Sequence, residues 1–417
     1  MTTASQFGGG SAPVGSFIQV AYALNDPAYL LANGAKILRS AYPLFSSTQL
    51  GVNTFTYTAR TKGVTSASTA IAVHAGLWVM AGAKTTTVNI QTTPDAVTFT
   101  QRSTPATLVN CDVRSLISDG INVVGVAVNV TGIDAFYSAD AITFTRSSGT
   151  VNCLDFSNPC VMAYSSTLGT LGRFIVANGT TGFYTSDDRG VTWTTQAHGL
   201  TGNVFSVAWT GAKFIALTSV LNTIFTSTTG LAGSWVSQTL LTVLLVQAAA
   251  STNTIASDGA GRVCIANAGN PNAPTPTSVL VSQDHGVTWS ERAFLDPKLA
   301  SLSYIFPTQV SFTNGLFFIT ATGNNDSGQV LTSKDGIAWV ILPDINLSRL
   351  SAGSSSISYK SGVYLAATFS ASVITFTEDT TKMYLPLVGQ ATPASPSNTG
   401  LLSSVANTNT VTYVKVA

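Results

Sequence analysis

Two eight-residue stretches decide the fold of this chain: Ser186-Asp-Asp-Arg-Gly-Val-Thr-Trp193 and Ser282-Gln-Asp-His-Gly-Val-Thr-Trp289. Both follow the pattern S-x-D-x-G-x-T-W, and each comes directly after a short apolar stretch typical of a β-strand. A third copy, Ser333-Lys-Asp-Gly-Ile-Ala-Trp339, is one residue shorter and keeps Ser, Asp, Gly and Trp in the same order. A motif that recurs within one chain predicts a repeat architecture, with each copy at the same place in its unit.

The residue types of the motif suit a tight turn between two antiparallel strands. Gly190 and Gly286 supply the backbone position that needs a positive φ angle. The aspartate oxygens can accept hydrogen bonds from N–H groups of the turn itself, the serine hydroxyls add weaker bonds, and the tryptophan rings bury a large area beside the hairpin. We therefore predict structural roles in these turns for Ser186, Asp188, Gly190, Thr192, Trp193, Ser282, Asp284, Gly286, Thr288, Trp289, Ser333, Asp335, Gly336 and Trp339.

Four further units are degenerate copies, in which a Gly turn and a hydrophobic run precede a worn version of the motif: Thr92–Phe99, Ser138–Phe144, Ser227–Trp235 and Phe376–Tyr384. Successive closing aromatic residues are 42 to 54 residues apart, and they are Phe99, Phe144, Trp193, Trp235, Trp289, Trp339 and Tyr384. A period of about 40 to 50 residues, with several short strands per unit such as Val204–Trp209, is the signature of a β-propeller. The sequence predicts an all-β fold: a seven-bladed β-propeller of four-stranded blades over residues 53–417, after a small β-rich segment over residues 1–52.

The composition favours strands and excludes several functional classes. Hydrophobic residues make up 45% of the 417 residues and charged residues only 9%, and the many Thr and Val residues suit strands. The formal net charge is +1 and the Lys and Arg residues are scattered, so no basic stripe faces a phosphate backbone and we expect no nucleic-acid binding. The longest apolar run, near Leu240–Ala250, is far shorter than the roughly 20 residues of a membrane span, so we expect no membrane insertion.

The cysteines and histidines form no pattern that would hold a metal. The cysteines are Cys111, Cys153, Cys160 and Cys264, and with only three histidines in the chain no zinc-ligand spacing can be drawn. Cys153 and Cys160 either close a small loop or remain thiols. The N-terminus lacks a secretion signal, and synthesis in a cytoplasm favours thiols. We expect no metal and no cofactor.

The repeated turn resembles the Asp-box, or BNR, repeat of sialidases and related β-propellers. The resemblance implies a propeller with these turns on its rim, and it does not imply glycosidase activity, because fold and function separate readily. A sialidase-like site would need an arginine cluster, a tyrosine nucleophile and acidic partners at the central channel, and the chain has no Arg-Ile-Pro motif. We therefore expect a protein that is not an enzyme and has no catalytic residues.

The carboxylates outside the boxes also fit structural positions. A glycosidase needs two of them in loops that face inward, and the candidates are Asp112, Asp119, Asp258, Asp296 and Asp344. Asp119-Gly120 and Asp258-Gly259 fit turns between the first and second strands of a blade. His285 lies inside a box, where we expect an exposed spacer.

The first fifty residues differ from the repeats in their sequence pattern, with Pro, Gly and Tyr in a particular order. The segment runs Pro13-x-Gly15, a short apolar stretch, Pro27-Ala-Tyr-Leu-Leu-Ala-Asn33-Gly34, Tyr42-Pro43-Leu-Phe45 and Leu50-Gly51. This order resembles the phage tail-collar type of segment found in tail-fibre proteins, and it departs from that pattern beside Ala28 and after Pro43, where spacers are missing. The attachment residues that the resemblance implies are Pro13, Gly15, Pro27, Asn33, Gly34, Tyr42 and Pro43.

The two ends of the chain also bear on how the ring closes. The N-terminal segment is too small to bury a core of its own, so we expect it to dock on the propeller or on a partner; the alternative is a small β-rich cap that closes the first blade. A closed ring has no open sheet edge. We expect either Asn53–Thr58 or Asn409–Ala417, which both alternate like strands, to complete a terminal blade.

These features predict a bacteriophage virion structural protein, a tail fibre or similar tail-associated component, which is synthesised in the host cytoplasm. We expect the N-terminal segment to bind other virion proteins, with the chain present as a homo-oligomer or in many copies. The propeller loops would serve as an interaction module for a host surface glycan or protein. The alternatives are a sialidase-like or other Asp-box glycan-processing enzyme, a capsid decoration protein and a bacterial assembly factor.

Overall fold

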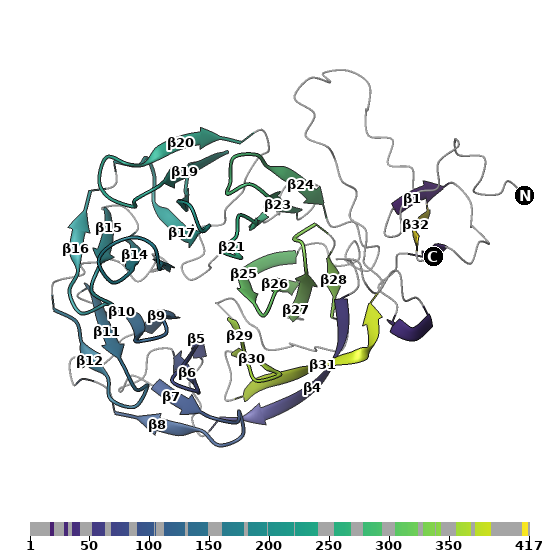
Figure 1. Cartoon of the computed structure of the whole chain (residues 1–417), viewed down its shortest axis with the longest axis horizontal. Helices are drawn as coiled ribbons and strands as arrows, with labels where there is room; N and C mark the ends of the chain where they lie inside the picture. The colour runs from purple at the N-terminus through teal and green to yellow at the C-terminus, as the bar shows by residue number, and fades with distance from the viewer. Residues whose placement is uncertain are drawn as a thin grey trace, which may run out of the picture.

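The computed structural model of the chain is a ring of seven four-stranded antiparallel β-sheets around a central channel (Figure 1), which confirms the predicted fold. The structure describes residues 17–20, 29–31, 36–41, 52–62, 68–82, 90–103, 105, 112–129, 132–148, 161–178, 182–197, 199–220, 222–240, 254–267, 278–293, 305–323, 328–337, 339–342, 356–367, 372–384 and 411–415. No helix in these ranges is both long and apolar enough to cross a membrane.

Six blades are formed by consecutive strands, in order from the channel to the rim. Blades one to three comprise β5 (Ser68–His74), β6 (Leu77–Gly82), β7 (Ile90–Thr93) and β8 (Thr100–Arg102); β9 (Asp112–Ser118), β10 (Val123–Asn129), β11 (Gly132–Ser138) and β12 (Thr145–Arg146); and β13 (Met162–Ser165), β14 (Arg173–Asn178), β15 (Gly182–Ser186) and β16 (Thr194–Gln196). Blades four to six comprise β17 (Val204–Trp209), β18 (Phe214–Thr218), β19 (Thr223–Ser227) and β20 (Val236–Thr239); β21 (Ile255–Ser257), β22 (Val263–Asn267), β23 (Ser278–Ser282) and β24 (Ser290–Ala293); and β25 (Ile305–Thr313), β26 (Leu316–Gly323), β27 (Gly328–Ser333) and β28 (Val340–Ile341).

Both faces of each sheet are buried against neighbouring blades, which explains the continuous apolar runs of the second strands. Every residue of β18 is buried. One side of this strand contributes Phe214 to a core shared with blade three, and the other side contributes Ile215 to a core shared with blade five. The rim strands are shorter and largely exposed, as at β8 and β12. The core therefore consists of a series of packed interfaces between blades, arranged around the ring.

The seventh blade is completed by a strand from the other end of the chain. It consists of β29 (Ile357–Lys360), β30 (Val363–Ala367), β31 (Ser372–Tyr384) and β4 (Val52–Thr61), and β4 pairs antiparallel with β31. This confirms that a terminal strand closes the ring, and it identifies Asn53–Thr58 as the strand that does so (Figure 1).

The predicted seventh turn motif is wrong. Residues Phe376 to Tyr384 lie within the continuous strand β31 and not in a turn between two strands. The physical reason is the origin of the fourth strand. Because β4 arrives from residues before the first blade, blade seven has no hairpin between its third and fourth strands.

The remaining described strands near the chain ends either form a separate small sheet or extend the sheet of blade seven. β1 (Phe17–Val20) and β2 (Tyr29–Leu31) both pair with β32 (Val411–Lys415) in a three-stranded sheet. β3 (Lys36–Leu38) pairs with the end of β31 and leads into the 3₁₀ turn Arg39–Ala41. The predicted C-terminal strand thus forms, but it pairs with the N-terminal segment. Several sequence predictions fall outside the described residues, namely those for Pro13, Gly15, Pro27, Asn33, Gly34, Tyr42, Pro43, Cys111, Cys153, Cys160, Asp296 and Asp344.

Candidate functional site

The turn between the third and fourth strands, here called the box turn, is held by side chains of the repeated motif. In blade five the Ser282 hydroxyl accepts a hydrogen bond from the Gly286 N–H (2.7 Å) and donates one to Asp284 (2.8 Å). The Asp284 carboxylate accepts from the Thr288 N–H (2.8 Å) and hydroxyl (2.6 Å). The Trp289 ring N–H donates to the Gly286 carbonyl (3.1 Å), and Gly286 has a φ angle of 80°.

Corresponding bonds hold the box turns of blades three and six. Ser186 accepts from the Gly190 N–H, Asp188 accepts from the Thr192 N–H, and the Trp193 ring donates to the Gly190 carbonyl. In the shorter third copy, Ser333 accepts from the Gly336 N–H, Asp335 from the Ile337 N–H, and the Trp339 ring donates to the Gly336 carbonyl. All the glycines that close these turns have positive φ angles.

Two of the degenerate copies adopt this geometry with other residues. In blade one the Ala96 N–H donates to the Thr93 hydroxyl (2.8 Å) and the Thr98 N–H to Asp95 (2.8 Å). In blade two Ser138 and Asp140 take the corresponding positions. Alanine stands where the clear copies have glycine, at φ angles of 59° and 57°. These degenerate turns therefore keep a positive φ angle without the glycine that adopts it at no steric cost.

Four of the box-turn carboxylates are held in their charged form, namely Asp95, Asp140, Asp188 and Asp284. The backbone N–H of Thr98 is the main cause that lowers the pKa of Asp95, and that of Thr143 does the same for Asp140. Burial alone would raise the pKa of Asp284, but hydrogen bonds from the side chain and backbone of Thr288 outweigh it and lower the pKa. A carboxylate with a lowered pKa is a poor proton donor at neutral pH.

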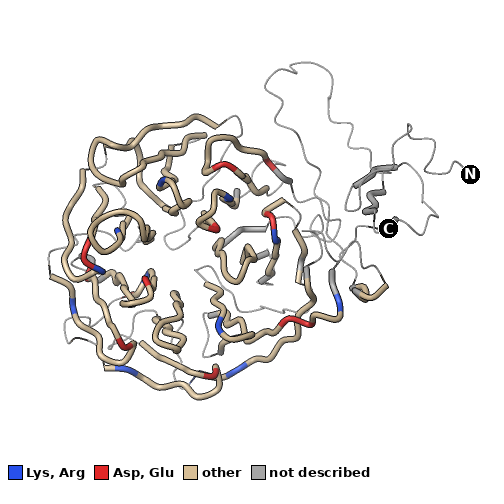
Figure 2. Tube along the Cα trace, in the orientation of Figure 1, with Lys and Arg blue, Asp and Glu red and all other residues tan. Residues whose placement is uncertain are grey.

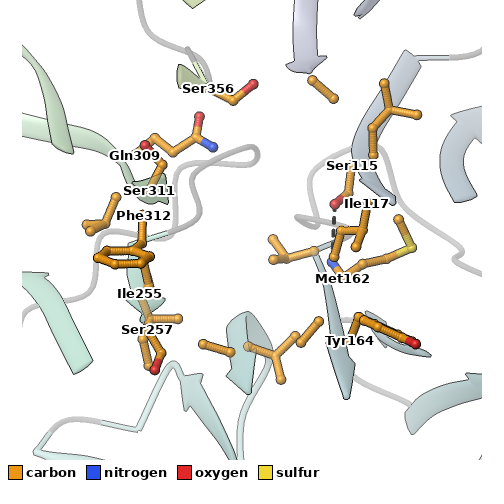
Figure 3. A pocket seen from close by; sticks show the side chains of 18 of the residues that line it. Ser115, Ile117, Met162, Tyr164, Ile255, Ser257, Gln309, Ser311, Phe312 and Ser356 are labelled. Atoms are coloured by element: carbon orange, nitrogen blue, oxygen red, sulfur yellow. Dashed lines mark hydrogen bonds between the residues drawn. The ribbon is translucent and has the colours of Figure 1, made fainter. Parts of the chain in front are cut away.

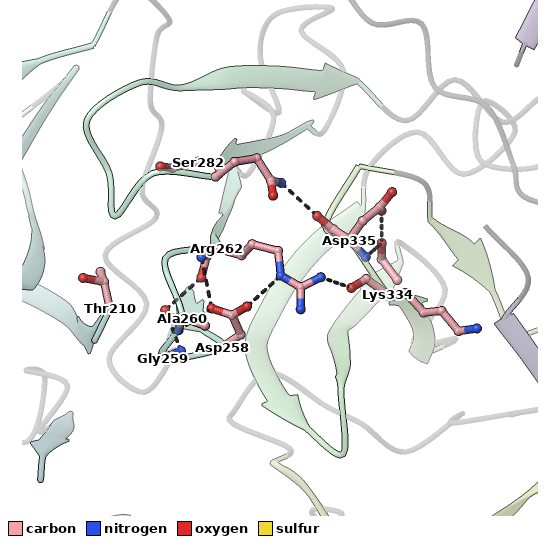
Figure 4. Close-up of polar contacts among 12 residues, drawn as sticks. Thr210, Asp258, Gly259, Ala260, Arg262, Ser282, Lys334 and Asp335 are labelled. Atoms are coloured by element: carbon pink, nitrogen blue, oxygen red, sulfur yellow. Dashed lines mark hydrogen bonds and ion pairs between the residues drawn. The ribbon is translucent and has the colours of Figure 1, made fainter. Parts of the chain in front are cut away.

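A second set of contacts joins five of the seven pairs of neighbouring blades. Side chains at or beside the turn between the first and second strands, here called the inner turn, donate to carbonyl oxygens in the following blade's box turn. These bonds run from His74 to Ala139 (3.0 Å), Asn122 to Arg189 (3.2 Å), Arg173 to Thr229 (2.8 Å), Arg262 to Lys334 (2.6 Å) and Lys360 to Pro94. Figure 4 shows Arg262 held between Asp258 and the Lys334 carbonyl. Each of these carbonyls is part of a box turn, so the box turns also position the blades.

Between blades four and five the contact runs in the opposite direction. The Nδ1 atom of His285 lies 2.9 Å from the Thr210 carbonyl of the inner turn in blade four, and a carbonyl can only accept. The prediction that His285 is an exposed spacer is therefore wrong. No sequence pattern indicates this role, because the partner is a backbone atom far away in the chain.

The described carboxylates outside the boxes also form local bonds and ion pairs. Asp119 accepts from the Ile121 and Asn122 N–H groups, and Asp258 accepts from the Ala260 N–H and the Arg262 guanidinium, as turn positions require. Asp112 lies in β9, 3.3 Å from Arg114. Figure 2 shows the charged residues of the described chain dispersed around the ring. No group of three His, Cys, Asp or Glu side chains within the described ranges is placed to hold a metal ion.

The central channel contains a cavity of about 420 Å³, which lies within the range of small-molecule sites. Its walls come from the first strands of all seven blades: β5, β9, β13, β17, β21, β25 and β29. The described lining is aliphatic, aromatic, hydroxyl and amide in character, and Arg114, paired with Asp112, is the charged residue in it. In Figure 3 Gln309, Ser311, Phe312 and Ser356 lie on one wall, opposite Ser115 and Met162. Such a surface can offer hydrogen bonds and apolar contacts to a neutral ligand.

No protein-family profile matches the chain, and no curated protein does. Among solved structures, virginiamycin B lyase from Staphylococcus aureus has a similar fold, with a TM-score of 0.54 at 12% identity over 78% of this chain and 99% of that one. YCF48 from Cyanidioschyzon merolae gives 0.53 at 13% identity over 77% and 98%. A structure of YCF48 bound to D1 peptide gives 0.52 at 12% identity over 78% and 97%. At these identities the likeness shows a shared β-propeller fold alone.

Proposed function

We propose that this protein is a structural component of a bacteriophage virion, associated with the tail, and that its propeller is a non-catalytic module for interaction or host-surface binding. The observation that carries the proposal is the order of residues from Pro13 to Gly51, which resembles the tail-collar type of segment. In support, the described strands β1 and β2 pair with β32 and lie outside the seven blades. A small sheet outside the ring is suited to contact a neighbouring protein.

The chemistry of the ring supports binding over catalysis. The described carboxylates bond within box turns and inner turns, in ion pairs, or to side chains of neighbouring strands, and those with shifted pKa values are shifted towards the charged form. The channel lining offers mainly neutral groups. One propeller of similar fold is known in complex with a peptide and another is a lyase, so the fold itself accommodates either role.

Particle association is the direct test. Lysates that contain phage particles from the source of the chain are separated on a density gradient, and the chain is detected with an antibody. We expect the full chain to band with the particles and a variant that begins at residue 52 to remain in the soluble fraction. Immunogold labelling then separates a tail protein from a capsid decoration protein. Recovery of the full chain only in the soluble fraction would overturn the virion assignment.

A hydrolysis screen tests the non-catalytic part of the proposal. Sialosides and bacterial and plant polysaccharides are incubated with the full chain, and we expect no release of reducing sugar or sialic acid. Asp112→Asn serves as the matched variant, since Asp112 is the carboxylate beside the channel residue Arg114. Turnover by the wild type that this substitution abolishes would favour the glycan-processing enzyme instead.

A further inference from the structure

Two polar side chains on one wall of the channel have buried atoms without a partner among the described residues. The Gln309 amide oxygen and the Ser356 hydroxyl oxygen are both buried from solvent and make no hydrogen bond there. Ser356 as a whole is 9% exposed. In the interior of a protein an unsatisfied polar group costs about 1–3 kcal/mol. These two atoms are therefore more readily explained by a ligand that completes their bonding than by the stability of the fold.

The two groups come from adjacent blades, whose first strands β25 and β29 are in contact. Gln309 is on β25 of blade six, and Ser356 directly precedes β29 of blade seven. Figure 3 shows both side chains directed toward the cavity, with Ser311 and Phe312 on the same wall. The wall thus combines an amide, two hydroxyls and an aromatic ring.

A local irregularity of the backbone places Gln309. The pairing of β25 with β26 shifts register between Pro307 and Gln309, where Pro307 has no N–H to donate to the ladder. Such a bulge changes the direction of the side chains that follow it. A similar shift in β5 precedes Ala70, which also lines the cavity.

We infer that this wall binds a neutral carbohydrate through two neighbouring hydroxyl groups. Because both oxygen atoms are shielded from solvent as they lie, the Gln309 and Ser356 side chains turn these atoms toward the cavity on binding. One sugar hydroxyl then donates to the Gln309 amide oxygen, which can only accept, and the adjacent sugar oxygen accepts from the Ser356 hydroxyl. The apolar face of the sugar ring packs on Phe312, whose own ring is held 4.7 Å from that of Phe317. A neutral sugar fits better than an acidic one, because Arg114, the charged group of the described lining, already pairs with Asp112. This inference rests on the host-surface binding proposed above.

Binding is measured with the full chain in free solution, by calorimetry and saturation-transfer NMR. The probes are the methyl glycosides of glucose, galactose, mannose and N-acetylglucosamine. We expect at least one probe to bind, and Gln309→Met and Ser356→Ala each to weaken it about 3- to 10-fold, the loss typical of one hydrogen bond. The matched controls Gln101→Met and Ser237→Ala, on rim strands β8 and β20, should leave binding unchanged.

A deoxy analogue identifies the hydroxyl that meets Gln309. The analogue that lacks this group should bind the wild type as weakly as the parent sugar binds Gln309→Met, and it should lose nothing further in that variant. Gln309→Met should also unfold at the same temperature as the wild type or a higher one, because it removes a polar atom without a partner. A lower unfolding temperature would show that Gln309 stabilises the fold, and it would overturn the inference.

Two other outcomes would also overturn it. If none of the four glycosides binds, the wall is not a site for neutral sugars. If N-acetyl-trialanine amide binds more tightly than any glycoside and loses affinity in the same variants, the ligand is a peptide. Association with phage particles is measured separately, so a failure here leaves that proposal standing, and loss of particle association would leave sugar binding intact.

Discussion

Blades five and seven show two ways of completing a four-stranded sheet. In blade five the rim strand β24 follows β23 through a turn of seven residues, and Ser282 and Asp284 hold that turn. In blade seven the rim strand β4 pairs with β31 across more than 300 residues of chain, as in the bond from Asn53 to Glu378. The first device is local and independent of the rest of the ring. The second makes the last blade depend on a strand that precedes the first blade.

The largest effect should follow removal of β4. Phe55 of this strand is 3% exposed and packs edge-on against Tyr364 and Phe376, so its loss opens a core and leaves β31 with a bare edge. A variant without residues 1–61 should give little soluble monomer in size-exclusion chromatography. The matched variant without residues 1–51 keeps β4 and should remain soluble and fold.

Removal of residues 409–417 is the control at the other end. We expect its unfolding temperature to stay within about 2–4 °C of the wild type, since β32 pairs outside the blades. Aggregation of this variant would show that both ends close the ring.

Asp284→Ala should weaken the box turn that joins β23 and β24 in blade five. The substitution removes an ionised acceptor that serves the Thr288 N–H and hydroxyl, and we expect a loss of about 1.5–3 kcal/mol in the free energy of unfolding. Asp379→Ala is the comparison in blade seven, where the carboxylate bonds to Thr381 and Lys382 of its own strand. Chemical denaturation should show a smaller loss there, and equal losses would contradict the distinction between the two blades.

Tyr364→Phe should destabilise the closing blade, in which β4 pairs with β31, by less than Asp284→Ala destabilises blade five. The hydroxyl of this fully buried residue donates to Glu378 at 2.5 Å and accepts from Asn314 at 2.7 Å, which joins blade six to the closing pair. Burial, and then the bond to Glu378, raise the pKa of Tyr364, so the hydroxyl remains a donor. We expect a loss of about 1–2 kcal/mol in the free energy of unfolding. Tyr359→Phe, a neighbouring ring on β29, is the control and should cost less.

A buried lysine, Lys62, directly follows the closing strand β4, and it predicts a change of stability at alkaline pH. Burial lowers the pKa of Lys62 to about 8, well below the value of about 10.4 in an unfolded chain. The folded state then binds fewer protons between these values, so stability should rise as the pH increases from about 8 to about 10. Lys62→Met should unfold at a temperature about 2–4 °C higher at pH 7 and should lack the rise. Thermal unfolding across this pH range is the measurement.

The stability of the protein at acidic pH should depend on the carboxylates of the box turns. A carboxylate whose folded pKa is lowered, such as Asp284, contributes stability above its unfolded pKa of about 3.9 and loses it as the pH falls through the folded value. The unfolding temperature of the wild type should therefore fall below about pH 4, and Asp284→Asn should show a slightly shallower fall. An identical acid profile in the two proteins would indicate that other carboxylates govern it.

The difference between the two blades also explains how far the sequence could be interpreted. The box turns were predictable because Asp284, Gly286 and Trp289 interact within eight residues, and a strand such as β17 was predicted with its observed bounds. The seventh turn was predicted wrongly because an aromatic residue at the expected spacing, Tyr384, ends a strand instead. The choice between the two closing strands depends on pairing across the whole chain, which no local pattern encodes.

The contacts between blades and the channel wall were not predictable for a related reason. The carbonyls of the next box turn accept hydrogen bonds from five side chains of four residue types: His74, Asn122, Arg173, Arg262 and Lys360. Any side chain that is long enough and carries an N–H group can make such a bond. Gln309 belongs to no motif, and its direction is set by a bulge beside Pro307. Geometry, more than residue identity, determines both features.

Closure by β4 has a consequence for how the protein folds while the ribosome synthesises it. The strand is synthesised before every blade, and its partner residue Glu378 follows Asn53 by 325 positions. At a translation rate of about 5–20 residues per second, the partner residue on β31 is synthesised roughly 16 to 65 seconds after β4. Throughout that interval the strand is exposed to other nascent chains, so crowded polysomes favour exchange of this strand between neighbours, and a chaperone that shields the nascent N-terminal region would raise the yield of closed rings.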